Sequence, residues 1–125
     1  TQTITANVNT KIIFGTEYFD TNSNYDTATG RFTPTVAGYY QFNAQAYFSA
    51  NSASYATIEL LKNGTKLAGS ATGTQTYVAA GPSISSVIYL NGSTDYVEAY
   101  AASGMSGTIN VTSSSTFSGA MIRSA

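Results

Sequence analysis

The 125-residue chain contains no cysteine and no histidine. Without cysteine it has no disulfide framework and no thiol nucleophile, and cysteine usage says nothing about its redox compartment. Without histidine, the Ser-His-Asp triad and the usual zinc sites are excluded as well. Together these two absences exclude the commonest classes of hydrolytic and zinc-dependent enzymes.

Charge and long apolar runs are also scarce. Only 9% of the residues are charged and the formal net charge is −1, so there is no basic field for nucleic acid or anionic lipid. No apolar run approaches the roughly 18 residues that a membrane-spanning helix needs. We therefore expect neither a nucleic-acid partner nor insertion into a membrane.

Six carboxylates remain as possible acid–base groups: Glu17, Asp20, Asp26, Glu59, Asp95 and Glu98. A glycosidase would need only two of them, held at the right spacing across a sugar cleft. Asp20 and Asp26 are close in the sequence, but their surroundings favour a role in turns. No glycine-rich loop that could cradle a phosphate is present. The sequence predicts a protein that is not an enzyme.

The abundant residues are those that suit strands and tight turns, namely Thr, Ser, Tyr, Val, Ile, Gly and Asn. Turn signals such as Asn63-Gly64, Gly81-Pro82 and Asn91-Gly92 separate short alternating or apolar runs. No helical periodicity, repeat or linker is evident, so we predict one domain over residues 1–125. Strands are predicted over residues 11–19, 30–35, 38–50, 56–61, 65–70, 84–90, 96–101, 108–112 and 116–122.

The segment 38–50 has the clearest strand pattern. Its alternation predicts one buried face and one outer face. The buried face comprises Tyr40, Phe42, Ala44, Ala46 and Phe48, and the outer face comprises Tyr39, Gln41, Asn43, Gln45, Tyr47 and Ser49.

Seven aromatic, acidic and glycine positions follow a specific spacing: Phe14, Asp20, Tyr25, Phe32, Gly38, Tyr40 and Phe42. This series resembles the signature of the complement C1q family, whose head domains share the TNF-like jelly roll. The family places a further aromatic where this chain has Ala44, which we expect to leave room for a larger neighbour. Segments 90–97 and 115–119 resemble the family's later strands. The resemblance implies an all-β, ten-stranded jelly-roll β-sandwich that assembles as a homotrimer.

The resemblance also implies that segments 38–50 and 96–101 lie side by side in the sheet nearest the trimer axis. The outer faces of these two segments would then bring Tyr39, Tyr47, Tyr96 and Tyr100 together. We predict that these four tyrosines form one aromatic patch at the trimer interface, because such a patch is too large to leave exposed on a monomer. The alternative is that they lie singly on an exposed sheet.

Asp95 is the one candidate metal ligand. Family members place a calcium-binding aspartate in a similar turn, and calcium requires six to eight oxygen ligands. In this chain Ser93 and Thr94 separate Gly92 from Asp95, which departs from that pattern. The alternative is an ordinary turn aspartate, and no other cofactor is predicted.

The leading functional hypothesis is a trimeric recognition or adhesion head on a phage or bacterial surface fibre. It would bind a surface glycan or protein through the loops at residues 51–55, 69–82 and 103–107. The chain starts with Thr1 and not with methionine, which we interpret as the C-terminal head of a longer fibrous protein on a cell or virion surface. The alternatives are a purely structural trimerisation or virion-decoration domain and a secreted, cytokine-like receptor ligand.

Overall fold

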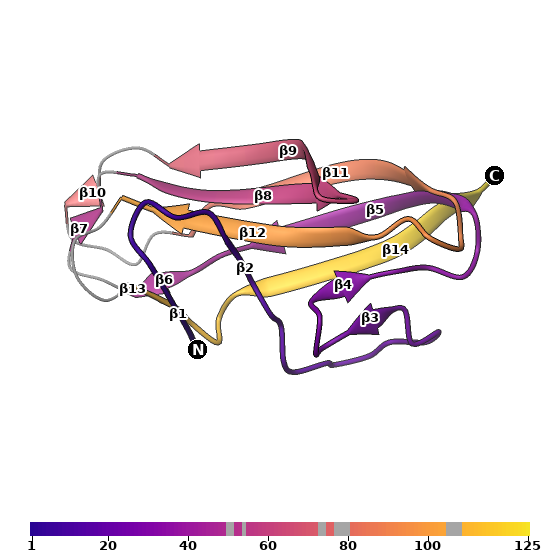
Figure 1. Ribbon diagram of the computed structural model, residues 1–125, viewed down its shortest axis with the longest axis horizontal. Helices are drawn as coiled ribbons and strands as arrows, with labels where there is room; N and C mark the ends of the chain where they lie inside the picture. The colour runs from indigo at the N-terminus through magenta and orange to yellow at the C-terminus, as the bar shows by residue number, and fades with distance from the viewer. Residues whose placement is uncertain (50–51, 54, 73–74, 77–80, 105–108) are drawn as a thin grey trace.

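A computed structural model gives the protein an all-β architecture (Figure 1). It describes residues 1–49, 52–53, 55–72, 75–76, 81–104 and 109–125, and within these ranges it has strands and no helix. The strands are β1 (Gln2–Ile4), β2 (Thr10–Lys11), β3 (Tyr25–Asp26), β4 (Arg31–Phe32), β5 (Gly38–Gln45), β6 (Phe48–Ser49), β7 (Ser52–Ala53), β8 (Ala56–Lys62), β9 (Thr65–Thr72), β10 (Gln75–Thr76), β11 (Ser83–Leu90), β12 (Val97–Ser103), β13 (Ile109–Val111) and β14 (Thr116–Ser124).

Two antiparallel sheets form the body of the domain (Figure 1). One has the strand order β11-β5-β14, and the other has the order β3-β4-β12-β8-β9 with β2 added to β12. Smaller sheets, β1-β13-β6 and β7-β10, lie towards one end. Fully buried side chains from both large sheets, including Phe42, Ile58, Leu60 and Leu90, belong to one hydrophobic core. The predicted all-β sandwich is therefore confirmed.

The alternation predicted for segment 38–50 is confirmed within β5. Residues Tyr40, Phe42 and Ala44 are buried, whereas the residues between them are exposed or half-buried. The Phe42 ring stacks on Phe117 with a centroid distance of 5.7 Å. Phe117 is also the cross-strand partner of Ala44, so a larger neighbour does lie opposite the alanine.

Three predicted strands are shorter than expected, because their backbone amides bond outside a sheet ladder. Of segment 30–35 only Arg31–Phe32 forms a strand, β4, because the Thr33 amide donates to the Asn24 carbonyl and Pro34 has no amide hydrogen. In segment 38–50, β5 ends at Gln45; the amide of Ala46 then donates to the carbonyl of Pro82 and that of Tyr47 to the Ser115 hydroxyl. The chain then continues in β6, which pairs with β13 in a different sheet.

In segment 11–19 only Lys11 belongs to a strand. The amide of Ile13 donates to the Gln2 side chain and that of Phe14 donates to the Tyr25 hydroxyl. These side-chain acceptors take the place of a neighbouring strand.

The Asn63-Gly64 hairpin predicted between two strands joins β8 to β9. Both turn residues have positive φ, 52° and 79°, as an Asn-Gly hairpin turn requires. Gly92 also has a positive φ, and a Cβ placed there would lie 2.2 Å from the backbone nitrogen of Ala37. Only glycine fits this turn between β11 and β12.

Candidate functional site

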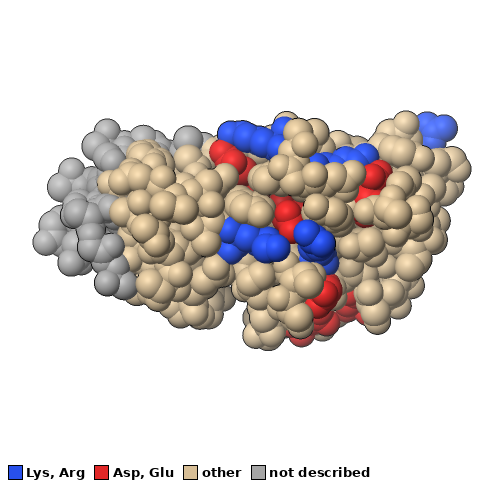
Figure 2. Space-filling view, in the orientation of Figure 1, with Lys and Arg blue, Asp and Glu red and all other residues tan. Residues whose placement is uncertain are grey.

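Charged side chains are distributed unequally between the two large sheets. The sequence has five basic and six acidic residues; none lies on β5 or β11, and β14 carries only Arg123. Figure 2 shows a band of basic and acidic side chains across the middle of one face of the molecule, over the sheet β3-β4-β12-β8-β9. The ion pairs of that sheet are Lys11–Glu98, Arg31–Glu98, Lys62–Asp95 and Lys66–Glu59.

We call the outward side of β11-β5-β14 the uncharged face, because the only charged residue of these three strands is Arg123, near the end of β14 and opposite Tyr39. One half of it is apolar, with Tyr39 on β5 and Val87 and Tyr89 on β11, all of which are exposed. Tyr39 and Tyr89 are cross-strand partners and their ring centroids are 5.4 Å apart. Large apolar side chains that cluster in this way are more typical of an interaction site than of ordinary exposed surface.

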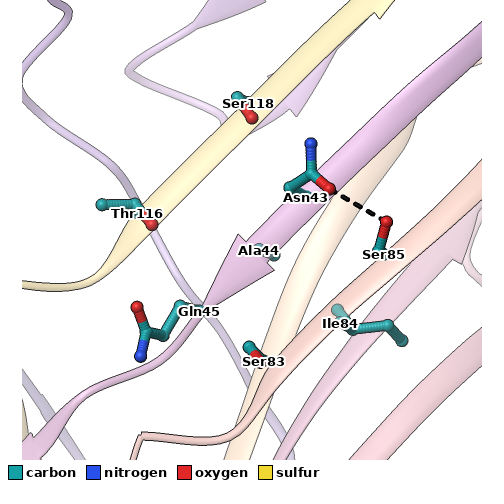
Figure 3. Close-up of a pocket in the computed structure, with 8 residues that line it drawn as sticks. All are labelled: Asn43, Ala44, Gln45, Ser83, Ile84, Ser85, Thr116 and Ser118. Carbon is teal, nitrogen blue, oxygen red and sulfur yellow. Dashed lines mark hydrogen bonds between the residues drawn. The ribbon is translucent and has the colours of Figure 1, made fainter.

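The other half of the uncharged face is polar and hollowed (Figure 3). Here a shallow cleft of about 400 Å³ is lined mainly by amide and hydroxyl side chains. Gln41 donates a 2.7 Å hydrogen bond to the Ser85 hydroxyl, which donates in turn to Asn43 Oδ1 at 2.9 Å. These bonds fix the amides, and none of the residues that line the cleft is charged.

The structure does not bring the four predicted tyrosines together. Tyr39 lies on the uncharged face, and Tyr47 follows β5, half-buried beside Gly81. Tyr100 lies on β12 and Tyr96 immediately before it, in the other sheet, because β12 pairs with β2, β4 and β8 whereas β5 pairs with β11 and β14. The four tyrosines therefore do not form a single patch within one copy, and the interface role of Tyr39, Tyr47, Tyr96 and Tyr100 stays a prediction.

Val87 and Tyr89 were missed as site residues. The signal was the alternation of residues 84–90: Ile88 and Leu90 are buried, so Val87 and Tyr89 must point to the opposite side. What the sequence did not reveal was that this strand is the neighbour of β5.

Glu98 lies on the side of β12 away from the core, but it is only 3% exposed. Its Oε1 accepts hydrogen bonds from Lys11 Nζ at 3.1 Å and from Arg31 Nε at 3.0 Å. The hydrogen bond to Glu98 raises the pKa of Arg31, whose guanidinium lies 4.1 Å above the ring centroid of Tyr96. Tyr96 therefore packs in a charged cluster whose ion pairs are internal to the chain.

Asp95 is held by donors from its own turn and from the β8–β9 hairpin. Its oxygens accept hydrogen bonds from Asn63 Nδ2 at 2.7 Å and from the Asn91 amide at 3.1 Å, and Lys62 Nζ lies 2.8 Å away. Lys62 first, and Asn63 next, hold the pKa of Asp95 below its ordinary value. Over the described ranges no group of three or more acidic residues lies together to hold a metal. This arrangement fits the turn role, and calcium binding by Asp95 stays a prediction.

The pH dependence of stability should report this role of Asp95. Because its pKa is lowered in the folded state, its stabilisation is present above the ordinary value of 3.8 and is lost as the pH falls through the lower, folded value. We expect the melting temperature of the wild type to fall more steeply on acidification below pH 4 than that of Asp95→Asn. Thermal unfolding followed by circular dichroism at a series of pH values measures this, with Glu17→Gln as the exposed control. Equal slopes for the wild type and Asp95→Asn would contradict the assignment.

The antiparallel sandwich and its strand pairing define a jelly-roll-like β domain. The family model described as the C1q domain matches residues 1–122, so the chain belongs to the C1q domain family. Domains of this family are non-enzymatic recognition modules that are typically trimeric and secreted. No helix in the described part of the chain is long and apolar enough to cross a membrane.

Among solved structures, the globular domain of zebrafish complement 1qA protein is similar, with a TM-score of 0.76 and 22% sequence identity. The match covers 100% of this chain and 94% of the zebrafish chain. At this level of identity the likeness confirms the fold. A search of curated proteins found no significant match.

Proposed function

We propose that the chain is a homotrimeric, non-enzymatic recognition head whose three copies meet at the uncharged face. The observation that carries this proposal is the segregation of charge: β5 and β11 have no charged residue and β14 has only Arg123, whereas the opposite sheet carries four internal ion pairs. Charged residues are depleted and tyrosines enriched in the buried centre of protein interfaces. The exposed Tyr39, Val87 and Tyr89 supply such a centre.

Three-fold symmetry is supported by the family, whose domains are typically trimeric. The apolar face alone would suit a dimer equally well. In a cyclic trimer, each copy contributes the same face around one axis. The apolar half of the face would then be packed and dry, whereas the amide and hydroxyl groups around Asn43 and Ser85 would be paired across the axis or hydrated. The hydrogen bonds already formed within each copy lower the cost of ordering these groups.

The recognition role belongs to the surface left free by assembly. Three copies raise a weak single-site affinity through avidity, so a head of this kind suits the end of a fibre. We place it outside the cell or on a virion, as the C-terminal head of a longer phage or bacterial fibre protein. The absence of cysteine, the low charge and the richness in hydroxyl groups support this assignment.

The loops predicted to carry a ligand, residues 51–55, 69–82 and 103–107, lie partly outside the described residues. Their described parts include β7 and β10, which pair with each other at the end of the molecule away from the C-terminus (Figure 1). This end stays a candidate for contact with a surface protein.

Binding to an oligosaccharide array and to intact bacterial cells tests the recognition role. The fluorescently labelled domain is compared with a Val87→Asp variant, which we expect to be monomeric. A recognition head should bind one of these probes as a trimer and lose about a hundredfold or more of its apparent affinity as a monomer. A trimer that binds neither probe would contradict recognition and support a purely structural trimerisation domain.

A further inference from the structure

A second groove lies between the irregular segment 12–18 and the turn that joins β13 to β14. Its volume is about 750 Å³, within the range of roughly 300–1,000 Å³ common for ligand sites. Thr116, at the start of β14, lines both this groove and the cleft on the uncharged face. Otherwise the two hollows are formed by different residues, so this groove is a separate candidate site.

The side chains that line the groove are uncharged, and most of them carry hydroxyl groups. Thr16, Ser113, Ser114 and Thr116 are exposed and able to donate and accept hydrogen bonds. The Gln2 side chain is less available, because it donates to the Lys11 carbonyl and accepts from the Ile13 amide. The groove therefore offers several neutral hydroxyl groups along a wall that Gln2 holds in place.

An aromatic side chain completes the lining. Tyr18 is 93% exposed and lines the groove, whereas its neighbour Phe19 is 82% exposed and does not. Most tyrosines bury much of their ring, so a fully exposed ring beside a polar groove is a candidate contact surface. Its electron-rich face attracts the weakly positive C–H groups of a sugar ring, while sugar hydroxyls would bond to the serine and threonine side chains.

We propose that this groove binds a neutral saccharide, with Tyr18 as the stacking platform and the hydroxyl groups of Thr16, Ser113 and Ser114 as hydrogen-bonding partners. The neutral class follows from the side chains of the lining, none of which is a cation that could pair with a sialic acid or sulfate group or a carboxylate that could pair with an amino sugar. This assignment rests on the proposed role as a recognition head and gives it a glycan ligand at a defined place.

The test uses the trimeric domain on an array that carries neutral, sialylated and sulfated oligosaccharides. The wild type should bind neutral glycans in preference to the acidic ones. Tyr18→Ala should weaken that binding about tenfold, the loss of one aromatic contact, and Thr16→Val should weaken it severalfold. Phe19→Ala, one residue away and outside the groove, is the matched control and should bind as the wild type does.

The outcomes separate this inference from the proposed function. Glycan binding that survives both Tyr18→Ala and Thr16→Val would overturn the groove and leave the recognition role intact. A preference for sialylated or sulfated glycans would overturn the neutral class. If the wild type binds no glycan, the saccharide site is wrong even if a protein ligand is found. Light scattering on Tyr18→Ala completes the set: a loss of trimer mass would assign Tyr18 to the contact between copies and would also overturn the proposal.

Discussion

A Val87→Asp variant should run as a monomer of 13.1 kDa at concentrations where the unmodified domain is trimeric. Val87 lies on β11, in the apolar half of the uncharged face and opposite Gln41 of β5. In a trimer the substitution would bring three carboxylates, one from each copy, into the interface, and burying an unpaired charge costs several kcal/mol. Size-exclusion chromatography with light scattering measures the effect directly.

The matched control is Val8→Asp. Val8 is 48% exposed and Val87 is 50% exposed, so the two changes are alike in chemistry and in the surface they alter. Val8 lies in the loop between β1 and β2, on the side of the other large sheet: the neighbouring Asn9 donates a hydrogen bond to Glu59 of β8. The control variant should keep the trimer mass. Loss of the trimer in both variants, or in neither, would contradict the assignment of the interface to the uncharged face.

Replacing Phe42 by alanine should lower the free energy of unfolding by about 3–5 kcal/mol, the typical cost of removing a large buried ring. Phe42 is fully buried, stacks on Phe117 and meets the ring of Phe32 edge-on at 5.1 Å. Gly119 packs so closely that a Cβ there would lie 2.6 Å from the Phe42 ring. The surrounding residues are therefore fitted to this ring, and its loss leaves a cavity between the sheets.

Urea unfolding at a fixed protein concentration measures this change, because the apparent stability of an oligomer depends on concentration. Phe19→Ala removes the same ring from an exposed site and should change the stability by no more than about 0.5 kcal/mol. Similar losses for the two variants would contradict the place of Phe42 in the core.

The sequence was sufficient for the features that depend on local patterns. The alternation of residues 38–45 identified which side chains of β5 face the core, because successive strand residues point to opposite faces. Asn63-Gly64 identified the β8–β9 hairpin, because both residues tolerate positive φ. The spacing from Phe14 to Phe42 identified the family.

The arrangement of strands in sheets was not accessible in the same way. Alternation shows that Tyr39 and Tyr100 both point away from the core, but it does not show that they lie on opposite sides of the sandwich. That depends on which strands pair, and β5 pairs with segments some 40 and 75 residues further along the chain. The aromatic partner of Tyr39 is therefore Tyr89, from a strand that had not been placed beside it.

The roles of the charged residues depended on contacts of the same long range. Asp95 receives Lys62 and Asn63 from a hairpin about thirty residues earlier, and Glu98 receives Lys11 and Arg31 from strands still earlier in the chain. No local pattern predicts that these carboxylates are already paired. The groove beside Tyr18 was missed for a different reason: residues 11–19 were predicted to form a regular strand.

The central claim is self-association through the uncharged face, and the solution mass of the unmodified domain tests it most directly. Light scattering after size exclusion should give three times 13.1 kDa, and the mass should be unchanged by a chelator because Asp95 is held by protein donors. A mass of 13.1 kDa across the whole concentration range would contradict the account and leave the exposed Tyr39, Val87 and Tyr89 without an explanation.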